Sequence, residues 1–215
     1  MTSTPVALVD LPALLRGQQV VLRPYRSDDA ASVFVAIDES REHLRPWVAW
    51  VDRFATLEDV HAYCLRCAEH WQSRRDLAVG IFDGRDGRFL GGAGLHQPDW
   101  ERGTFEISCW LRATAAYRGY GTEALNLLAD LAFTRLDAKL IKLFSDVRNG
   151  PTRRLAQKCG YVLKGQVRNG YAAPDGQRVD LLVYSMTPED WQRAMQAREL
   201  EHGEAEATRD PQSFA

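Results

Sequence analysis

A backbone cradle for an anion is the chemistry that this sequence indicates most clearly, and it falls on residues 118–122. Gly119 and Gly121 lie between a strand-like segment and an amphipathic, helix-like one. Glycine takes backbone angles closed to other residues, so consecutive N–H groups in such a turn can converge on one anion. The positive end of the following helix dipole and the charge of Arg118 would add to them, which suits a pyrophosphate. The simpler alternative is a tight turn that binds nothing, because glycine pairs are common where strands give way to helices.

The usual nucleotide-binding and metal-binding patterns are absent from the sequence. There is no G-x-x-x-x-G-K-[ST] motif, and the two glycines do not open a first βαβ unit as a G-x-G-x-x-G motif would. Cys64 and Cys67 form a CxxC pair, but no second pair stands near them to complete four zinc ligands, so no metal is expected. We interpret both as structural cysteines of a helix, and Cys109 and Cys159 as structural residues in apolar surroundings.

The hydrophobic pattern predicts the elements that would position this cradle. Strands are expected over residues 20–22, 77–82, 89–96, 104–111, 140–147, 161–167 and 179–186. Helices are expected over residues 31–37, 40–50 (a short helix and loop), 56–75, 121–136 and 151–159, and from about residue 188. Short polar connections join the strands between residues 77 and 111, which indicates an antiparallel meander. The fold class is therefore α/β, a single domain with a mixed, mostly antiparallel central sheet flanked by helices.

Composition and charge exclude several classes of protein. With 215 residues, 45% of them hydrophobic and 26% charged, the chain is typical of one globular domain. A formal net charge of −2 gives no support for direct nucleic-acid binding. No apolar run is long enough to span a bilayer, and residues 1–15 lack the basic start of a signal peptide, so we expect no membrane partner and a cytoplasmic protein.

Two ordered motifs resemble one enzyme family. Residues 110–111 with residues 117–124 resemble the coenzyme A-binding motif of the GNAT superfamily of N-acetyltransferases, and most of all its RimJ/RimL-like branch, which acetylates N-terminal amines of ribosomal proteins. The family motif runs Q/R-x-x-G-x-G/A; its glycines fall on Gly119 and Gly121, while its first position falls on Ala116. Residues 149–152 and 158–161 resemble the family's later N-x-x-S and K-x-G-F segments. The likeness extends over about residues 18 to 190.

The resemblance implies acetyl-CoA as cosubstrate and a primary amine as acceptor. The expected domain covers residues 18–190, after an N-terminal extension (1–17) and before a terminal helix and disordered tail (191–215). The resemblance implies that these residues contact the coenzyme: Trp110, Leu111, Arg118, Gly119, Tyr120, Gly121, Thr122, Asn149 and Thr152. Asn149 would face the pantetheine arm, and Thr152 would approach the thioester sulfur.

Direct transfer of the acetyl group needs a neutral amine, a stabilised oxyanion and a departing thiolate. Glu106 is the candidate base, because a carboxylate is unexpected in the apolar strand 104–111. Alternation places Glu106 with Ser108 and Trp110 on one face, and an exposed or arginine-paired structural position is the alternative. Thr152 is the candidate acid, with a helix-starting role as the alternative. A backbone N–H would meet the oxyanion where the strand of Glu106 parts from its neighbour.

The residues expected on the acceptor side are Trp47, Trp50, His96 and Tyr171. The two tryptophans could wall the site or stack on a base, and ordinary packing is the alternative for Trp47. The acceptor is expected to be the α-amino group of a protein or peptide. A small amine, such as an antibiotic, a polyamine or an aminoacyl nucleotide, stays open, as does a non-catalytic acyl-CoA-binding module. Edge strands near the C-terminus could also pair two subunits into a homodimer.

Overall fold

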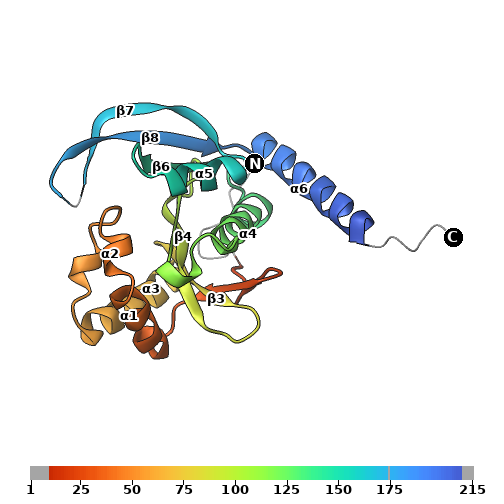
Figure 1. Cartoon of the computed structure of the whole chain (residues 1–215). Coiled ribbons are helices and arrows are strands. Elements are labelled where there is room, and N and C mark those ends of the chain that lie inside the picture. The colour runs from red at the N-terminus through yellow and green to blue at the C-terminus, as the bar shows by residue number, and fades with distance from the viewer. Residues whose placement is uncertain (1–9, 174, 210–215) are drawn as a thin grey trace.

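One central sheet carries helices on both faces in the computed structural model of the chain (Figure 1). The structure describes the backbone of residues 10–173 and 175–209, and the side chains of that part up to residue 200. The strands are β1 (Leu15–Arg16), β2 (Val20–Pro24), β3 (Leu77–Asp83), β4 (Phe89–Asp99), β5 (Thr104–Leu111), β6 (Leu140–Asp146), β7 (Val162–Ala172) and β8 (Arg178–Met186). The helices are α1 (Ala30–Asp38), α2 (Arg41–Leu44), α3 (Leu57–Ser73), α4 (Tyr120–Arg135), α5 (Gly150–Lys158) and α6 (Pro188–Arg209).

The sheet has the order β1-β2-β3-β4-β5-β6-β8-β7 within the described residues. Neighbouring strands are antiparallel except β5 and β6, which are parallel. The chain makes this one parallel pairing through α4, because a parallel connection needs a crossover and a hairpin cannot supply it. The predicted fold class, a mixed and mostly antiparallel sheet flanked by helices, is confirmed.

Strands β5 and β6 part in the middle of the sheet. They pair only from Thr104 to Glu106, whereas β5 stays paired with β4 as far as Leu111. On its far side β6 remains paired with β8 up to Asp146. The backbone of residues 107–111 therefore has a ladder partner on one side only, and its remaining N–H groups open toward the gap. The sequence analysis expected the strand of Glu106 to part from its neighbour, and the structure places the end of the pairing at Glu106.

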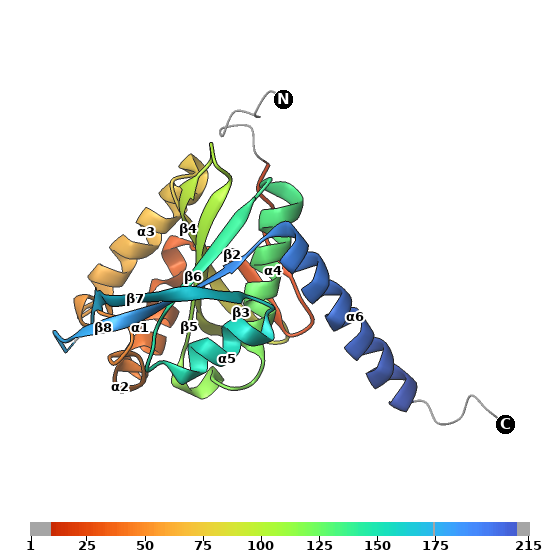
Figure 2. The same ribbon diagram turned by 90° about the horizontal axis from the view of Figure 1, so that it is seen from above.

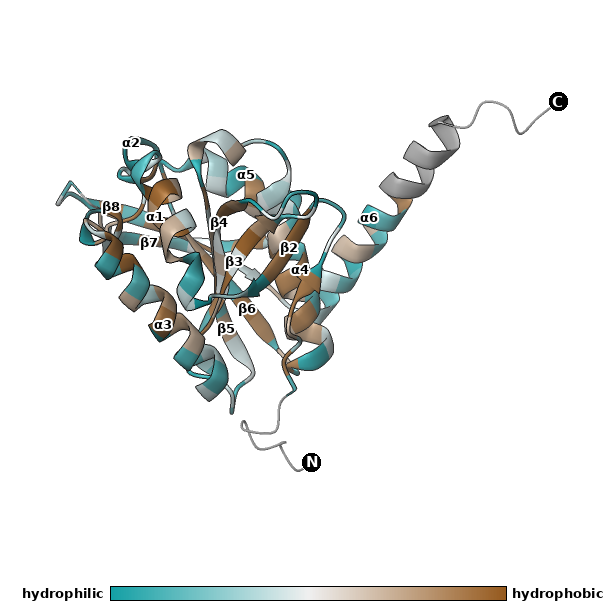
Figure 3. Ribbon diagram, turned by 90° about the horizontal axis from the view of Figure 1, so that it is seen from below, coloured by the Kyte–Doolittle hydropathy of each residue, from teal (hydrophilic) through white to brown (hydrophobic). Residues whose placement is uncertain are grey.

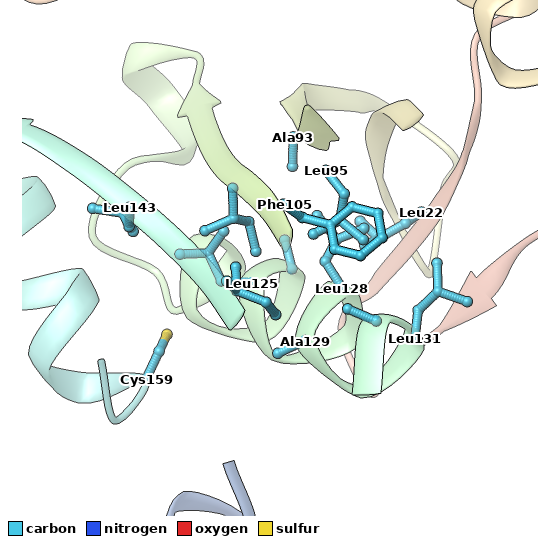
Figure 4. Packing of buried hydrophobic residues seen from close by; sticks show 14 of the residues in the cluster. Leu22, Ala93, Leu95, Phe105, Leu125, Leu128, Ala129, Leu131, Leu143 and Cys159 are labelled. Atoms are coloured by element: carbon cyan, nitrogen blue, oxygen red, sulfur yellow. The ribbon is translucent and has the colours of Figure 1, made fainter. Parts of the chain in front are cut away.

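Helix α4 covers one face of the sheet and encloses the larger core. It packs on β2, β4 and β5. From Gly91 onward, the odd-numbered residues of β4 and of the first half of β5 point into this core, where Ala93, Leu95 and Phe105 meet Leu125 and Leu128 (Figure 4). The even-numbered residues of these stretches therefore face the opposite side. At the start of β4, where the register with β3 shifts, the order is reversed: Leu90 lies in this core and Phe89 in the opposite cluster.

Helices α1 and α3 cover that opposite face. They lie together and pack on β2, β3 and β4. Helix α3 carries both hydrophobic and hydrophilic residues (Figure 3), and its buried residues are Val60, Cys64, Cys67 and Trp71. This spacing is the stripe of an amphipathic helix, so both cysteines of the CxxC pair are core residues. All four cysteines are free; Cys64, Cys67 and Cys159 are buried and Cys109 is half-buried, which agrees with the interpretation as packing residues.

The two ends of the chain differ from expectation. Residues 15–16 form β1 and pair with β2, so the sheet begins inside the segment taken as an extension. Helix α6 projects away from the sheet and continues to Arg209, beyond the start of the disordered tail expected at about residue 202 (Figure 2). Glutamate and alanine, both good helix formers, dominate this stretch. Residues 1–9 and 210–215 of the predicted extension and tail lie outside the described residues. No helix in the described part is long and apolar enough to cross a membrane.

Candidate active site

The predicted anion cradle is the N-terminus of α4. Gly119 is the N-cap residue, with a φ of 87° in the left-handed region. No side chain caps this helix, so the N–H groups of its first turn, which have no partner inside a helix, are free to bind a ligand. Gly121 differs from the expectation, because it is an ordinary helical residue whose added Cβ would contact Leu111 at 3.5 Å. Only Gly119 therefore needs the freedom of glycine.

The neighbouring side chains fix the position of this helix end. Tyr120 is buried, and its hydroxyl donates to Asp83 at 3.3 Å, so only its backbone can take part in the cradle. The Glu123 carboxylate accepts hydrogen bonds from the backbone N–H groups of Gln18 and Gln19. It thereby ties the β1–β2 turn to the first turn of α4. Arg118 is exposed beside the cradle, where its charge can reach a phosphate.

A second helix end lies across the gap. Asn149 is the N-cap of α5, and its Oδ1 accepts the backbone N–H of Thr152 at 3.0 Å. Thr152 therefore lies in the first turn of the helix, as the alternative role given for it required. The cap uses the Asn149 Oδ1 and the Thr152 backbone N–H, so the Asn149 amide NH2 and the Thr152 hydroxyl can bind other partners. Helix α5 packs against α4, and the Cys159 thiol donates to the Thr122 carbonyl at 3.7 Å.

An aromatic cavity of about 590 Å³ lies on the other face of the sheet, between the strands and helices α1 and α3. Trp50 and Trp110 form its wall, with ring centroids 5.4 Å apart in an edge-to-face arrangement. Trp110 also contacts Phe89, and Trp50 contacts Phe54. The cavity is lined by Ile37, Trp50, Arg53, Phe54, Asp59, Ala62, Tyr63, Arg66, Gly92, Ala93, His96, Ser108 and Trp110.

Two glycines of β4 keep the floor of this cavity open. A Cβ on Gly92 would lie 2.5 Å from Nε1 of Trp110. A Cβ on Gly94 would lie 2.7 Å from Cε1 of His96 and 3.0 Å from the backbone of Ala78. Both distances are shorter than van der Waals contact, so a side chain at either position would displace the ring beside it. The sequence analysis missed these residues, although glycines at alternate positions of a strand signal a close approach.

A hydrogen-bonded row of three polar side chains borders the cavity. The Asp76 Oδ2 lies 2.9 Å from the His96 Nδ1, and the His96 Nε2 lies 2.8 Å from the Ser108 Oγ. His96 is among the residues that line the cavity, and its expected place on the acceptor side stays a prediction. Asp76 and Ser108 were not predicted as site residues.

Glu106 lies beside this row and not among the residues that line the cavity. It is opposite His96 in the β4–β5 pairing and beside Lys142 in the β5–β6 pairing. Its carboxylate accepts a hydrogen bond from the Gln97 side chain at 3.4 Å. The predicted alternation, with Glu106, Ser108 and Trp110 on one face, is confirmed, whereas its role as a base stays a prediction.

Trp110 and Leu111 point to opposite faces of the sheet. Leu111 packs against the core under α4, and Trp110 packs against the cluster under α1 and α3. The structure therefore brings the Leu111 side chain near the cradle, whereas the indole of Trp110 belongs to the aromatic cavity.

A second cavity of about 520 Å³ lies beside α2. It contains Trp47 and Arg45 from the α2 segment, with Arg148 and Asp175, which lie 3.7 Å apart. The late hairpin loop thus reaches the α2 segment through Asp175. Tyr171, on β7, is not among the residues that line either cavity.

The family of the chain follows from this fold and from comparison with known proteins. A model described as an acetyltransferase (GNAT) domain matches residues 19–162. The chain belongs to the GNAT family and is an acetyl-CoA-dependent N-acetyltransferase, as its motifs predicted. The relatives support the RimJ/RimL-like branch.

Individual relatives resemble nearly the whole fold. YdaF of Bacillus subtilis (strain 168), which carries the provisional name ribosomal N-acetyltransferase, is 23% identical over 178 residues, covering 82% of this chain and 95% of YdaF. RimJ of Mycobacterium smegmatis, solved with a CoA disulfide, has a TM-score of 0.75 at 24% identity, covering 89% and 96% of the two chains. The microcin C7 self-immunity acetyltransferase MccE, solved with acetyl-CoA and AMP, has a TM-score of 0.74 at 19% identity, covering 80% and 93%. The likeness to these solved structures concerns the fold.

Proposed function

We propose that this enzyme transfers the acetyl group of acetyl-CoA to the α-amino group of a peptide or protein N-terminus. The observation that carries the proposal is the parting of β5 and β6 after Glu106, between the α4 cradle and the aromatic cavity. A cosubstrate bound at the cradle can reach through this gap, and an acceptor in the cavity can meet it there. The provisional name of YdaF supports the choice of acceptor.

The residues present fit acetyl-CoA. Free N–H groups at the start of α4 and the exposed Arg118 suit the pyrophosphate. The unpaired side of residues 107–111 offers N–H groups to the pantetheine arm and to the thioester oxygen. We assign to the Thr152 hydroxyl, at the start of α5, the donation of a proton to the departing sulfur. A thiol has a pKa of about 8.5, so little acid assistance is needed.

The chemistry favours an α-amino group over a lysine side chain. An α-amine has a pKa of about 7.7–8.0, against about 10.4 for lysine, so far more of it is neutral near pH 7. The nitrogen lone pair attacks the thioester carbon directly, the C–N bond forms and the C–S bond breaks. Residues of the segment 45–54 line both cavities, so the second cavity is our candidate site for the residues that follow the reacting amine.

A nucleotide-bearing amine is the second candidate acceptor. Trp50 and Trp110 wall a cavity large enough for a base, and aromatic rings favour stacking. The structure of MccE, which contains AMP, has a similar fold. The peptide is preferred because YdaF, whose match covers 82% of this chain, carries the provisional name of a ribosomal N-acetyltransferase.

A matched pair of peptides tests the proposal. One carries a free N-terminus and an internal lysine, and the other has the same sequence with its N-terminus blocked. Release of CoA thiol with the free peptide alone supports transfer to the α-amine. Equal release with both peptides points to lysine, and release only with an aminoacyl adenylate analogue points to the second candidate.

We also propose a homodimer that forms through β7. This strand is at the edge of the sheet and pairs with β8 alone. Val162, Leu163 and Val167 are exposed on it, and an uncovered apolar edge strand favours pairing with another chain. Light scattering on the wild type and on Val167→Lys tests this: a dimer that the charge makes monomeric supports it, and a monomeric wild type contradicts it.

A further inference from the structure

Asp76, His96 and Ser108 form a hydrogen-bonded row that ends at the parting of the strands. We propose that this row, and not Glu106, removes the proton from the acceptor amine, with His96 as the base and Ser108 as its contact to the amine. The inference rests on the acetyl transfer described above and assigns the acid–base residues of that site. The distances are 2.9 Å from Asp76 Oδ2 to His96 Nδ1 and 2.8 Å from His96 Nε2 to Ser108 Oγ.

The hydrogen bonds suit one tautomer of the neutral imidazole. A carboxylate can only accept, so the His96 Nδ1 donates its hydrogen to Asp76. In the neutral ring the His96 Nε2 then carries no hydrogen and accepts the Ser108 O–H. The basic His96 Nε2 and the Ser108 proton that it can accept thus lie side by side at the cavity. Asp76 holds the ring in this orientation and stabilises the imidazolium that forms, as a carboxylate does for a catalytic histidine in general.

The position of Ser108 connects this row to the reacting atoms. Glu106 is the last residue of β5 that pairs with β6, and Ser108 is the next residue on the same face. Ser108 is exposed and lines the cavity. Its partner in the β4–β5 pairing is Gly94, which has no side chain that could cover the Ser108 hydroxyl. An amine that enters from the aromatic cavity therefore meets Ser108 where a thioester in the gap would lie.

Two protons move in the proposed step. The ammonium gives one proton to the Ser108 oxygen while the Ser108 proton passes to the His96 Nε2. The neutral amine then attacks the thioester carbon, and the Thr152 hydroxyl gives its proton to the departing thiolate and takes one back from the new nitrogen. Amide and free thiol result, and the imidazolium returns its proton to water. The side chains of His96 and Asp76 are 29% and 26% exposed, so water can reach the pair.

The pH dependence of the imidazole also reflects the charged groups on the elements that enclose the cavity. Glu106 has a weaker claim as the base, because its carboxylate accepts a hydrogen bond from Gln97 and it is not among the residues that line the cavity. Asp76 contacts His96, and Glu106, which pairs with Lys142, is opposite His96 in the sheet. Asp59 and Arg66 of α3 and Arg53 line the same cavity as His96.

The pH dependence of kcat/KM for an α-amine acceptor tests the inference. At pH 7, His96→Gln is expected to lower kcat/KM about 100-fold, the usual scale for loss of a general base. Between pH 7 and pH 8 the deficit is expected to shrink about fivefold, because the neutral fraction of an α-amine with a pKa of about 7.7–8.0 rises by that factor. Ser108→Ala is expected to behave similarly, and Ser108→Thr, which keeps a hydroxyl, to restore most of the rate. Asp76→Asn should reproduce the pH-dependent deficit.

Matched measurements separate this inference from the proposed acceptor. His61→Gln, at an exposed position of α3, is the control histidine. Acetyl-CoA affinity by isothermal titration should be unchanged in every variant, which shows that the fold is intact. A deficit that is equal at all pH values, or a pH-dependent deficit in Glu106→Gln alone, overturns the relay. The ratio of variant to wild-type rate can be measured on any amine that the enzyme acetylates, whereas the choice between peptide and small amine tests only the proposed acceptor.

Discussion

Gly94 and His96 are two residues apart on β4, and the absent side chain of the first leaves room for the imidazole of the second. A Cβ at position 94 would lie 2.7 Å from the His96 Cε1. The ring can therefore lie across position 94 and reach Ser108 on the neighbouring strand. The catalytic geometry of the acceptor side thus depends on a residue that carries no functional group.

This relationship predicts the effect of Gly94→Ala. The methyl group should push the imidazole away from Ser108 and lower kcat about 10-fold to 100-fold, a part of the usual contribution of a general base. Acetyl-CoA affinity should not change, because the cradle is on the other face. Gly165→Ala is the control, since an added Cβ there meets nothing within 4 Å. Equal activity of the two variants would show that the space at position 94 is not needed.

The cradle predicts a binding defect in Gly119→Val. Residue 119 has a φ of 87°, and a residue with a side chain pays about 1–2 kcal/mol for the left-handed region. If the turn must keep this shape to bind the pyrophosphate, acetyl-CoA affinity should fall about tenfold. Isothermal titration measures it directly. Gly87→Val has the same kind of strain in the turn between β3 and β4, with a φ of 73°, and should bind acetyl-CoA normally. Unchanged affinity in Gly119→Val would remove the cradle assignment.

The aromatic wall predicts a change in the acceptor KM. Trp50→Ala removes the ring that packs edge-to-face on Trp110, a contact worth about 0.5–1.5 kcal/mol in aromatic pairs. The KM for a peptide acceptor should rise about twofold to tenfold, with acetyl-CoA affinity unchanged. Trp50→Phe keeps an aromatic ring and should restore most of the loss. We assign acetyl-CoA to the face under α4 and the acceptor to the face under α1 and α3. If Trp50→Ala weakened acetyl-CoA binding and left the acceptor KM unchanged, this assignment would be wrong.

The Tyr120 hydroxyl, at the start of α4, donates to Asp83 at the end of β3. This contact predicts that a part of the unfolding free energy depends on pH. Hydrogen bonds from Arg85 hold the pKa of the Asp83 carboxyl well below its usual range, and the Tyr120 hydroxyl adds to them. A carboxyl with a lowered pKa in the folded state stabilises the fold above its unfolded pKa of about 3.9, and this contribution is lost as the pH falls further. Asp83→Asn should therefore lower the unfolding free energy at pH 7, and this difference should shrink progressively as the pH falls below about 4 toward the lowered pKa of the folded state. Urea titrations at several pH values measure it, with the exposed Asp86→Asn as the control. A difference that stays constant with pH would contradict the prediction.

Local patterns were sufficient to predict the fold. Alternation along residues 104–111 and the amphipathic stripe of residues 121–136 each reflect burial on one face, so strands and helices followed with small errors at their ends. A parting of the strand of Glu106 from its neighbour was expected, but the residue at which the pairing ends was not. The helical character of residues 202–209 was missed because their polar composition favoured disorder over their helix propensity.

The acceptor side was harder to predict, because contacts between strands decide it. Asp76 and His96 are separated by 20 residues, and His96 and Ser108 by 12, so no local motif connects them. The direction of Trp110 depends on the register of β4 and β5, which placed its indole over Gly92 and away from the cradle. A sequence shows that a strand alternates, but it does not show which neighbour supplies the opposite residue.

A single conjugate that joins CoA to the α-nitrogen of a peptide through an acetyl bridge tests the central claim most directly. If the cradle and the aromatic cavity meet at the parted strands, the conjugate engages both sites at once. Its affinity by isothermal titration should exceed that of CoA about 100-fold or more, since joining the two ligands makes the second contact intramolecular. Gly119→Val and Trp50→Ala should each weaken it. A conjugate that binds no more tightly than CoA, or that ignores Trp50→Ala, would contradict the claim that the acceptor amine meets acetyl-CoA between β5 and β6.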